Sequence, residues 1–353
     1  MKKLIFCFDG TCNSPQDADD FFEDSSISNV LKLHAFFGGR LNSFNARKNV
    51  KRNSVNTITT AQQSFYYSGV GTRGSWLKRK FNAMFAPPYG DMDDIIANAR
   101  ADLSTHFSEG DAIYIFGFSR GAAIARMFAA HLPYKVKFLG VFDTVAATRG
   151  SLDLNPDTFP ASGIVFENGT LGAHVEQAVH LLSLDEKRIL FQPTLFNYDK
   201  RVTEIWFAGV HSDIGGSYWF DGLSDITLQF MLDSVRDKLS IQDINEIDFA
   251  GLKVPGAQDS ICIDDLNIKP LVDGTLHSQI RTNRNAATLA PRLVRVNIDD
   301  AKSKHIPIIH HTVIERFNLV SGYRPYSLRD LKFKVINANG KLGKIQQGIS
   351  SLG

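Results

Sequence analysis

Short, nearly continuous apolar runs alternate along this chain with stretches in which apolar residues recur at helical spacing. The apolar runs are bounded by turn-forming residues, which indicates buried strands. They lie at residues 3–8, 112–116, 135–141 and 204–210, and residues 62–70 (QQSFYYSGV) also predict a strand. The stretches of helical periodicity lie at residues 26–36, 91–107, 122–132, 173–191 and 223–239. Strands and helices therefore follow one another through most of the chain.

Strands that are apolar along their whole length are typical of a parallel sheet covered by helices on both faces. In such a sheet the functional loops follow the carboxyl ends of the strands. We therefore predict an α/β fold with a mostly parallel sheet, and we expect the functional site at that edge.

The segments between these elements indicate the domain organisation. The chain has 353 residues and 43% hydrophobic content, which is enough for one large core. Residues 14–60 and 149–170 are polar or rich in turn-forming residues and predict insertions into a catalytic domain spanning 1–330. Residues 240–300 give no clear pattern, and residues 331–353 predict a C-terminal tail rich in lysine, glycine and serine.

One strand breaks abruptly into a helix with a serine at the break. The apolar run 112–116 leads into G-F-S-R-G, and a strong helix former follows. In a nucleophile elbow the serine takes a strained backbone conformation, so the positions two residues before and after it must lack side chains. Gly117 and Gly121 meet this requirement, and we predict that Ser119 is a nucleophile.

Residues around this turn also provide hydrogen-bond donors for the oxygen of an attacked carbonyl group. The helix after Ser119 presents the N–H groups of its first turn, including that of Arg120, at its positive dipole end. A backbone N–H from Gly10 or Thr11, after the first strand, would face the N–H of Arg120 across the carbonyl. We expect Gly10, Thr11 and Arg120 to form an oxyanion hole.

The loop Asp9-Gly10-Thr11 has a rival interpretation as part of a phosphatase of the haloacid dehalogenase type. The D-x-D-G-T loop of those enzymes places a nucleophilic aspartate two residues before a second aspartate. Here the first of these positions is Cys7, so the phosphatase interpretation lacks its nucleophile.

Composition and charge bear on compartment and partners. The formal net charge of +2 is near neutral and does not favour a nucleic-acid partner. Cys7, Cys12 and Cys262 show no zinc-like spacing, which suits a reducing compartment without disulfides. The N-terminal segment has too few apolar residues for a signal peptide, and no apolar run is long enough to span a membrane. We expect a protein that is cytoplasmic as synthesised, with export only by a signal-independent secretion system.

Residues 76–85 interleave basic and large apolar side chains. The basic residues are Lys78, Arg79 and Lys80, and the apolar ones are Trp76, Phe81, Met84 and Phe85. On a helix this pattern gives a short basic amphipathic face, which predicts a peripheral membrane contact near the substrate entrance. The alternative is a solvated helix whose aromatic residues pack on the core.

Several segments together resemble a known family. They are FDGTCN, YYSGVGT, GDAIYIFGFSRGAAIAR, FLGVFDTV with HLLSLDEKRILFQPTLF, WFAGVHSDIGGSY and IHHTVIERF. The chain resembles, over roughly residues 3–330, the α/β-hydrolase domain of type VI secretion phospholipase effectors and related uncharacterised proteins. The resemblance implies a serine esterase or lipase, phospholipase A-like, that acts on acyl esters with phospholipids as the main substrate class.

Chain order suggests the remaining catalytic residues, because α/β-hydrolases run nucleophile, acid, histidine. We count the run at 204–210 as the second strand beyond the elbow strand, where the acid usually follows, which favours Asp213. His310 heads the segment that matches the family and is our expected base. A competing assignment takes His211 as the base and Asp143 as the acid, since both also follow strands.

In the expected mechanism Ser119 attacks the acyl carbon, His310 moves the proton, and Asp213 orients the imidazole. Asp9, Asp143 and Asp213 could instead gather around a divalent cation, but this chemistry needs none, so we expect no metal and no cofactor. A second class of function also remains open, in which the hydrolase fold is catalytically idle and serves as a binding or effector module.

Overall fold

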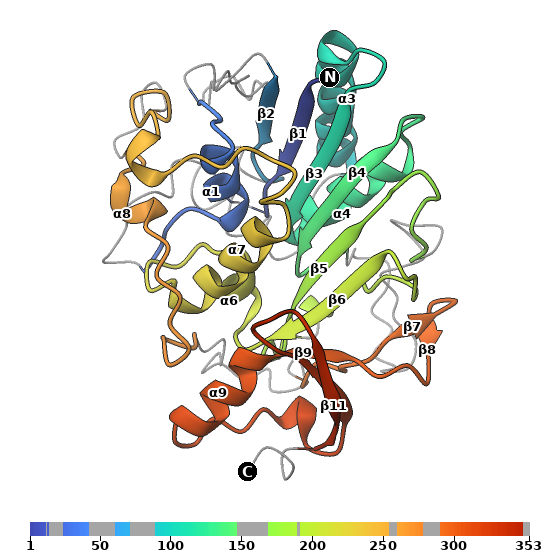
Figure 1. The fold of residues 1–353 in the computed structure, drawn as a ribbon, viewed down its shortest axis with the longest axis vertical. Coiled ribbons are helices and arrows are strands. Elements are labelled where there is room, and N and C mark those ends of the chain that lie inside the picture. Colours follow the sequence, from blue (N-terminus) through green and yellow to red (C-terminus); the bar gives the residue numbers. More distant parts are fainter. Residues whose placement is uncertain are drawn as a thin grey trace.

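The computed structural model describes most of the chain (Figure 1). The described residues are 1–11, 13, 24–41, 61–70, 89–146, 169–188, 191–253, 260–277 and 290–348. The expected membrane-contact segment 76–85, Cys12 and most of the two expected insertions lie outside these residues. Within the described part, no helix combines the length and apolar composition needed to cross a membrane.

A nine-stranded sheet runs through the molecule in the order β11-β10-β9-β6-β5-β4-β3-β1-β2. Neighbouring strands pair in parallel, except that β11 is antiparallel to β10. The strands are β1 (Lys3–Phe8), β2 (Gln62–Tyr67), β3 (Ala112–Phe118), β4 (Val136–Phe142), β5 (Ala178–Ser183), β6 (Val202–Phe207), β9 (Ile308–His310), β10 (Lys332–Ile336) and β11 (Leu342–Gln347). A separate two-stranded sheet joins β7 (Asn297–Ile298) to β8 (Ala301–Lys302). The predicted α/β fold is confirmed.

Helices cover both faces of the sheet, as the fully apolar strands require (Figure 1). One core cluster joins the sheet to α1 (Asn29–Phe36) and α7 (Gly222–Asp233). A second cluster on the other face joins it to α3 (Tyr89–His106) and α4 (Ser119–Ala130). A third cluster packs around β9 and β10.

The remaining helices are short or lie near the far end of the sheet. They are α6 (His211–Gly215), α8 (Ile263–Leu266), α9 (His311–Leu319), and the 3-10 turns η4 (Ile244–Glu246) and η6 (Tyr326–Leu328). The predicted helix start near residue 26 is fixed by Ser28, whose hydroxyl accepts the N–H of Leu31 at 3.2 Å. His310 is the last residue of β9, and His311 is the first residue of α9.

Two predicted segments need correction. The stretch 173–191, expected to be a helix, contains β5, all of whose residues are buried. Its neighbours β4 and β6 pair with it on both sides, and these ladders outweigh local helical spacing. The segment 331–353, expected to be a tail, contributes β10 and β11 to the main sheet. β10 pairs in parallel with β9, and β11 pairs antiparallel with β10.

Candidate active site

The predicted nucleophile elbow is present between β3 and α4. Ser119 has φ of 57°, in the left-handed region that costs a residue with a side chain about 1–3 kcal/mol. A Cβ on Gly117 would lie 2.6 Å from the Gly121 carbonyl oxygen, and a Cβ on Gly121 would lie 2.2 Å from that of Asp9. Both glycines are therefore required by close backbone approach, and the strained turn places Ser119 at the carboxyl edge of the sheet.

The loop after β1 packs directly against this elbow. A Cβ on Gly10 would lie 2.7 Å from the ring of Phe118, the residue before Ser119. Asp9 closes the loop, because its Oδ1 accepts the Gly10 N–H at 2.7 Å and its Oδ2 accepts the Tyr66 hydroxyl at 2.5 Å. Burial raises the pKa of Asp9 to about 6, against these hydrogen bonds. The Gly10 amide, expected in an oxyanion hole, is thus already engaged.

Thr11 differs from Gly10 in this respect. Its Oγ1 is buried and has no hydrogen-bond partner among the described residues. The next loop comes very close to Thr11, since a Cβ on Gly69 would lie 3.1 Å from the Thr11 amide nitrogen. Arg120, the third expected donor, lies in the first turn of α4. The two expected donors Thr11 and Arg120 therefore come from different elements, the loop after β1 and the first turn of α4.

Nothing in this loop supports a phosphatase. Cys7, where that chemistry needs an aspartate, is buried in the core, and burial raises the pKa of its thiol far above the ordinary range. Asp9 is bonded to Tyr66 and to its own loop. In the described part of this loop, Cys7 replaces the required aspartate, and the close approach of Gly10 to Phe118 packs the loop against the elbow.

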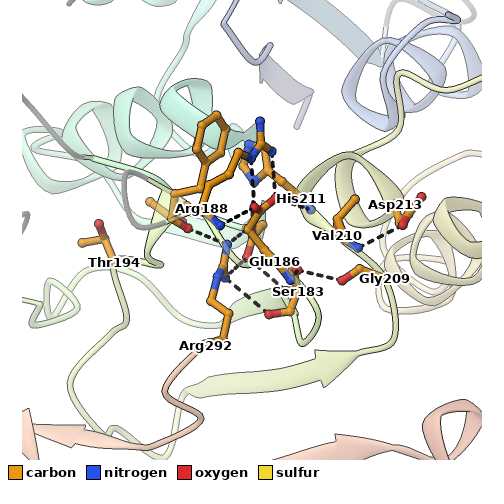
Figure 2. Close-up of polar contacts among 12 residues, drawn as sticks. Ser183, Glu186, Arg188, Thr194, Gly209, Val210, His211, Asp213 and Arg292 are labelled. Carbon is orange, nitrogen blue, oxygen red and sulfur yellow. Dashed lines mark hydrogen bonds and ion pairs between the residues drawn. The ribbon is translucent and has the colours of Figure 1, made fainter. Parts of the chain in front are cut away.

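Asp143, directly after β4, and His211, at the start of α6 and labelled in Figure 2, form the first of two carboxylate–imidazole pairs. The distance from His211 Nδ1 to Asp143 Oδ2 is 2.6 Å. Arg292 donates from both terminal nitrogens to the same carboxylate, at 2.8 Å each. The competing pair expected from the sequence is therefore brought together, with a buried cation that the sequence did not indicate.

The electrostatics of this first pair favour a neutral imidazole. Burial alone would raise the pKa of Asp143, but Arg292 and the bond from His211 hold it well below its ordinary range. Burial lowers the pKa of His211, and Arg188 acts in the same direction. The ring of His211 lies 4.7 Å from that of Phe118, and its buried Nε2 has no hydrogen-bond partner in the described part of the chain.

Asp213 and His277 form the second pair. Asp213 Oδ1 lies 2.5 Å from His277 Nδ1, and Oδ2 accepts the backbone N–H groups of Val210 and His277. The ring of Tyr218 stacks on His277 with 3.7 Å between centroids. On the other side of the imidazole, Asp24 Oδ2 lies 3.0 Å from Nε2 in a charge contact that is not a directed hydrogen bond.

The electrostatics of the second pair favour a charged imidazole. Burial disfavours the cationic imidazole, but the bond to Asp213 and the charges of Asp213 and Asp24 raise the pKa of His277 above its ordinary value. Asp213 has a hydrogen bond from His277 and two from backbone amides, and none of these partners is a resident lysine or arginine. This pair is therefore built to stabilise an imidazolium.

The structure places His310, the expected base, in contacts that do not include Asp213. Its Nδ1 bonds the Thr312 hydroxyl at 2.8 Å, and its ring stacks on Phe207 with 4.3 Å between centroids. Burial lowers the pKa of His310 to about 3. The aromatic packing of this ring marks a core histidine. The structure pairs Asp213 with His277 instead.

Sequence reasoning missed His277 because it lies in the region 240–300, which shows no strand or helix pattern. Chain order alone leaves four histidines after Asp213, namely His277, His305, His310 and His311. The expected strand count was also one short, because β5 intervenes and Asp213 follows the third strand beyond the elbow strand. The turn at Gly274, three residues before His277, was the only local signal.

The described residues include no group of three or more side chains arranged to hold a metal ion. The three carboxylates once considered for a cation have separate partners. Asp9 bonds Tyr66, Asp143 bonds Arg292 and His211, and Asp213 bonds His277.

Comparison with known proteins identifies the family of this chain. The family model for "T6SS, Phospholipase effector Tle1-like, catalytic domain" matches residues 2–134 and 129–234, which is more than half of the chain. The chain belongs to this family. The matched part of this Tle1-like chain includes the elbow, Asp143 and the short helix α6 that carries Asp213.

Individual relatives of this Tle1-like chain are distant. The uncharacterized protein YEL023C of Saccharomyces cerevisiae is 31% identical over 141 residues, which is 36% of this chain and 17% of the yeast protein. An uncharacterized protein from Pseudomonas aeruginosa is 20% identical, with a TM-score of 0.44, over 77% of this chain and 49% of that one. The Tle1 effector bound to the VgrG spike is 22% identical, with a TM-score of 0.36, over 62% of this chain and 51% of the effector. The chain thus spans about half the length of these two structures and less of the yeast protein.

Proposed function

We propose that this chain is a serine hydrolase that cleaves acyl ester bonds of phospholipids, with Ser119 as nucleophile, His277 as base and Asp213 as acid. The observation that carries the proposal is the Asp213–His277 pair, at the same sheet edge as a serine in a strained elbow. Family membership supports the substrate class. The order nucleophile, acid, histidine is kept along the chain.

Two features favour His277 over His211 as the base. A general base becomes a cation in the transition state, and among the described residues no lysine or arginine bonds Asp213 to compete with an imidazolium. Asp143 is already neutralised by two bonds from Arg292, so it adds less to a charged His211. The Asp143–His211 pair is the second candidate, supported by its position next to Phe118 and by the unpartnered Nε2.

The proposed reaction begins when His277 Nε2 turns from Asp24 toward the Ser119 hydroxyl and takes its proton. Catalytic hydrogen bonds often tighten only once substrate is bound. Ser119 then attacks the acyl carbon, and His277 returns the proton to the departing alcohol. Asp213 holds Nδ1–H throughout and fixes the tautomer. Water hydrolyses the acyl-enzyme by the same route.

Thr11 is our proposed oxyanion donor, together with the Arg120 amide. Replacing Thr11 with valine keeps the branched shape but removes the buried, unpartnered hydroxyl. We expect kcat on a short acyl ester to fall about tenfold or more, because one donor to the developing oxyanion is lost. Thr11→Ser should retain most of the activity. Equal losses in the two variants would mean that the hydroxyl is not a donor.

Covalent labelling tests the proposed function itself. A fluorophosphonate probe should attach to the wild-type protein and not to Ser119→Ala, because the probe is attacked by an activated serine. Mass spectrometry of the labelled peptide should place the adduct on Ser119. A folded wild-type protein that takes up no probe and hydrolyses no ester would favour the catalytically idle module. One observation supports that alternative: Ser119 forms no hydrogen bond to His211 or His277 in the described structure.

We also propose that the phospholipid lies in a membrane and that residues 76–85 make the peripheral contact. The support is the sequence pattern of basic and aromatic residues alone. Export by a secretion system that reads no signal peptide is likewise a proposal, supported by the effector family.

A further inference from the structure

Arg188 is held rigidly beside the candidate site by its neighbours. Its Nε and Nη2 donate to the two oxygens of Glu186, at 2.9 Å and 2.7 Å (Figure 2). Its Cζ lies 3.5 Å from the centroid of the Phe191 ring. Glu186 is fully buried, and its bonds with Arg188 lower its pKa to about 2 although burial opposes this. The guanidinium is therefore fixed in direction as well as in place.

This fixed guanidinium has donors left over. A guanidinium carries five N–H groups, and Glu186 takes one from Nε and one from Nη2. Nη1 makes no hydrogen bond among the described residues. The side chain of Arg188 is 19% exposed, whereas that of Arg292, the other arginine of this cluster, is fully buried. The outer edge of Arg188 is thus a fork that can receive two oxygens of an anion.

Several contacts connect Arg188 to the catalytic groups. Glu186 Oε2 also accepts the backbone N–H of His211 at 3.2 Å, and the rings of Phe191 and His211 are 5.0 Å apart. Figure 2 shows Arg188, Glu186 and His211 gathered together. Burial raises the pKa of Tyr218 to about 12, and the charge of Arg188 opposes that shift. Tyr218 stacks on His277, so the charge of Arg188 reaches His211 of the first pair and a ring that packs against the second pair.

The charges around Arg188 are compatible with the binding of an anionic group. Glu186 and Asp143 carry negative charge, Arg188 and Arg292 carry positive charge, and burial keeps His211 neutral. The charges of these four side chains balance one another, so this group by itself presents no excess of negative charge to a bound phosphate. A phosphodiester offers two unesterified oxygens, which match the free edge of one guanidinium.

We propose that Arg188 binds the phosphate group of the phospholipid substrate and so selects phospholipids over uncharged glycerides. This rests on the proposed function, because the scissile ester and the phosphate must belong to one molecule. The acyl carbonyl is at Ser119 while the headgroup phosphate is held at the outer edge of Arg188. Arg188 therefore determines specificity rather than chemistry.

The test compares two substrates that differ only in the phosphate-containing headgroup. Arg188→Met should lower kcat/KM for dihexanoylphosphatidylglycerol about tenfold to hundredfold, because a charge-assisted bond is lost. It should leave kcat/KM for dihexanoylglycerol within about twofold. The double variant Glu186→Gln/Arg188→Met removes both charges, avoids an unpaired buried carboxylate, and should show the same selective loss. Equal losses on both substrates, or none on either, would overturn the proposal.

Arg201 provides a matched control. It forms the same fork with a carboxylate two residues earlier, Asp199, at 3.0 Å and 2.6 Å, but at the opposite end of β6. Arg201→Met should not change the preference between the two substrates. If it shifts the preference as strongly as Arg188→Met, a general effect of lost positive charge replaces the proposed contact.

Binding measurements separate this proposal from the hydrolase mechanism. Calorimetry should compare the binding of dihexanoylphosphatidylglycerol to Ser119→Ala and to Ser119→Ala/Arg188→Met. The affinity of Ser119→Ala should be about tenfold higher or more. This readout needs no turnover, so a failed hydrolase proposal and a failed phosphate contact are distinguishable. Inorganic phosphate, used as a second probe, should compete only weakly with the lipid. Tight binding of inorganic phosphate would identify a free-phosphate site and contradict substrate selection.

Discussion

Replacing His277 with alanine is expected to lower kcat/KM for a soluble short-chain ester by a factor of at least roughly 10³, close to the loss in Ser119→Ala. The reason is that nucleophile and base act as a unit, so that loss of either removes most of the acceleration. Asp213→Asn should cost somewhat less, because it leaves the imidazole in the wrong tautomer. Initial rates with p-nitrophenyl butyrate, on variants whose melting curves match the wild type, measure the effect.

His310 and His211, the other two candidate bases, serve as controls for this assignment. His310→Gln should remain active to within about tenfold, because His310 packs against Phe207 and, within the described part of the chain, hydrogen-bonds Thr312 rather than a residue of the site. His211→Gln should stay well above the activity of His277→Ala if Asp213–His277 is the catalytic pair. An inactive His211→Gln together with an active His277→Ala would transfer the role of base to the Asp143–His211 pair.

Replacing Arg292 with methionine is expected to lower the free energy of unfolding by about 3–5 kcal/mol. Arg292 and Asp143 are both fully buried, so the substitution leaves a buried carboxylate without its cation. Because the pKa of Asp143 is held below its ordinary value, the pair stabilises the fold above about pH 4 and this contribution is lost as the pH falls through the folded pKa. The difference between wild type and variant should therefore shrink in acid. Urea denaturation at several pH values measures it.

Two further variants control for this prediction. Asp143→Asn/Arg292→Met removes both charges and should recover much of the lost stability. Arg236→Met breaks a pair with Asp233 whose side chains are 60% and 54% exposed, and should change stability by no more than about 1 kcal/mol. A loss in Arg292→Met no larger than that in Arg236→Met would show that the buried pair contributes little.

The elbow was predictable because its requirements are local. A strand, two glycines and a helix former within a dozen or so residues specify the turn, whatever surrounds it. The structure adds the measured strain at Ser119 and the close approach at Gly117 and Gly121. The positions of Asp143, His211 and Asp213 at one edge were also predictable, since each follows an apolar run and parallel strands end together.

The pairing of these residues was not predictable in the same way. His277 lies in a segment without a repeating pattern and reaches Asp213 from 64 positions along the chain. Arg292 reaches Asp143 across 149 positions. Likewise, β5 has helical spacing in its sequence and becomes a strand because β4 and β6 flank it. Such contacts depend on how far-apart segments pack, and no local pattern encodes them.

The sequence by itself determined the α/β class, the elbow and the set of polar residues at the carboxyl edge, because each follows from periodicity or turn chemistry over short distances. The tertiary structure decided which histidine faces which carboxylate, that His310 belongs to the core, and that Arg188 presents a free edge beside the site. These outcomes depend on burial and on distances between segments far apart in the chain. Desolvation and the placement of opposite charges, which set the pKa values of His211 and His277, exist only once the chain has folded.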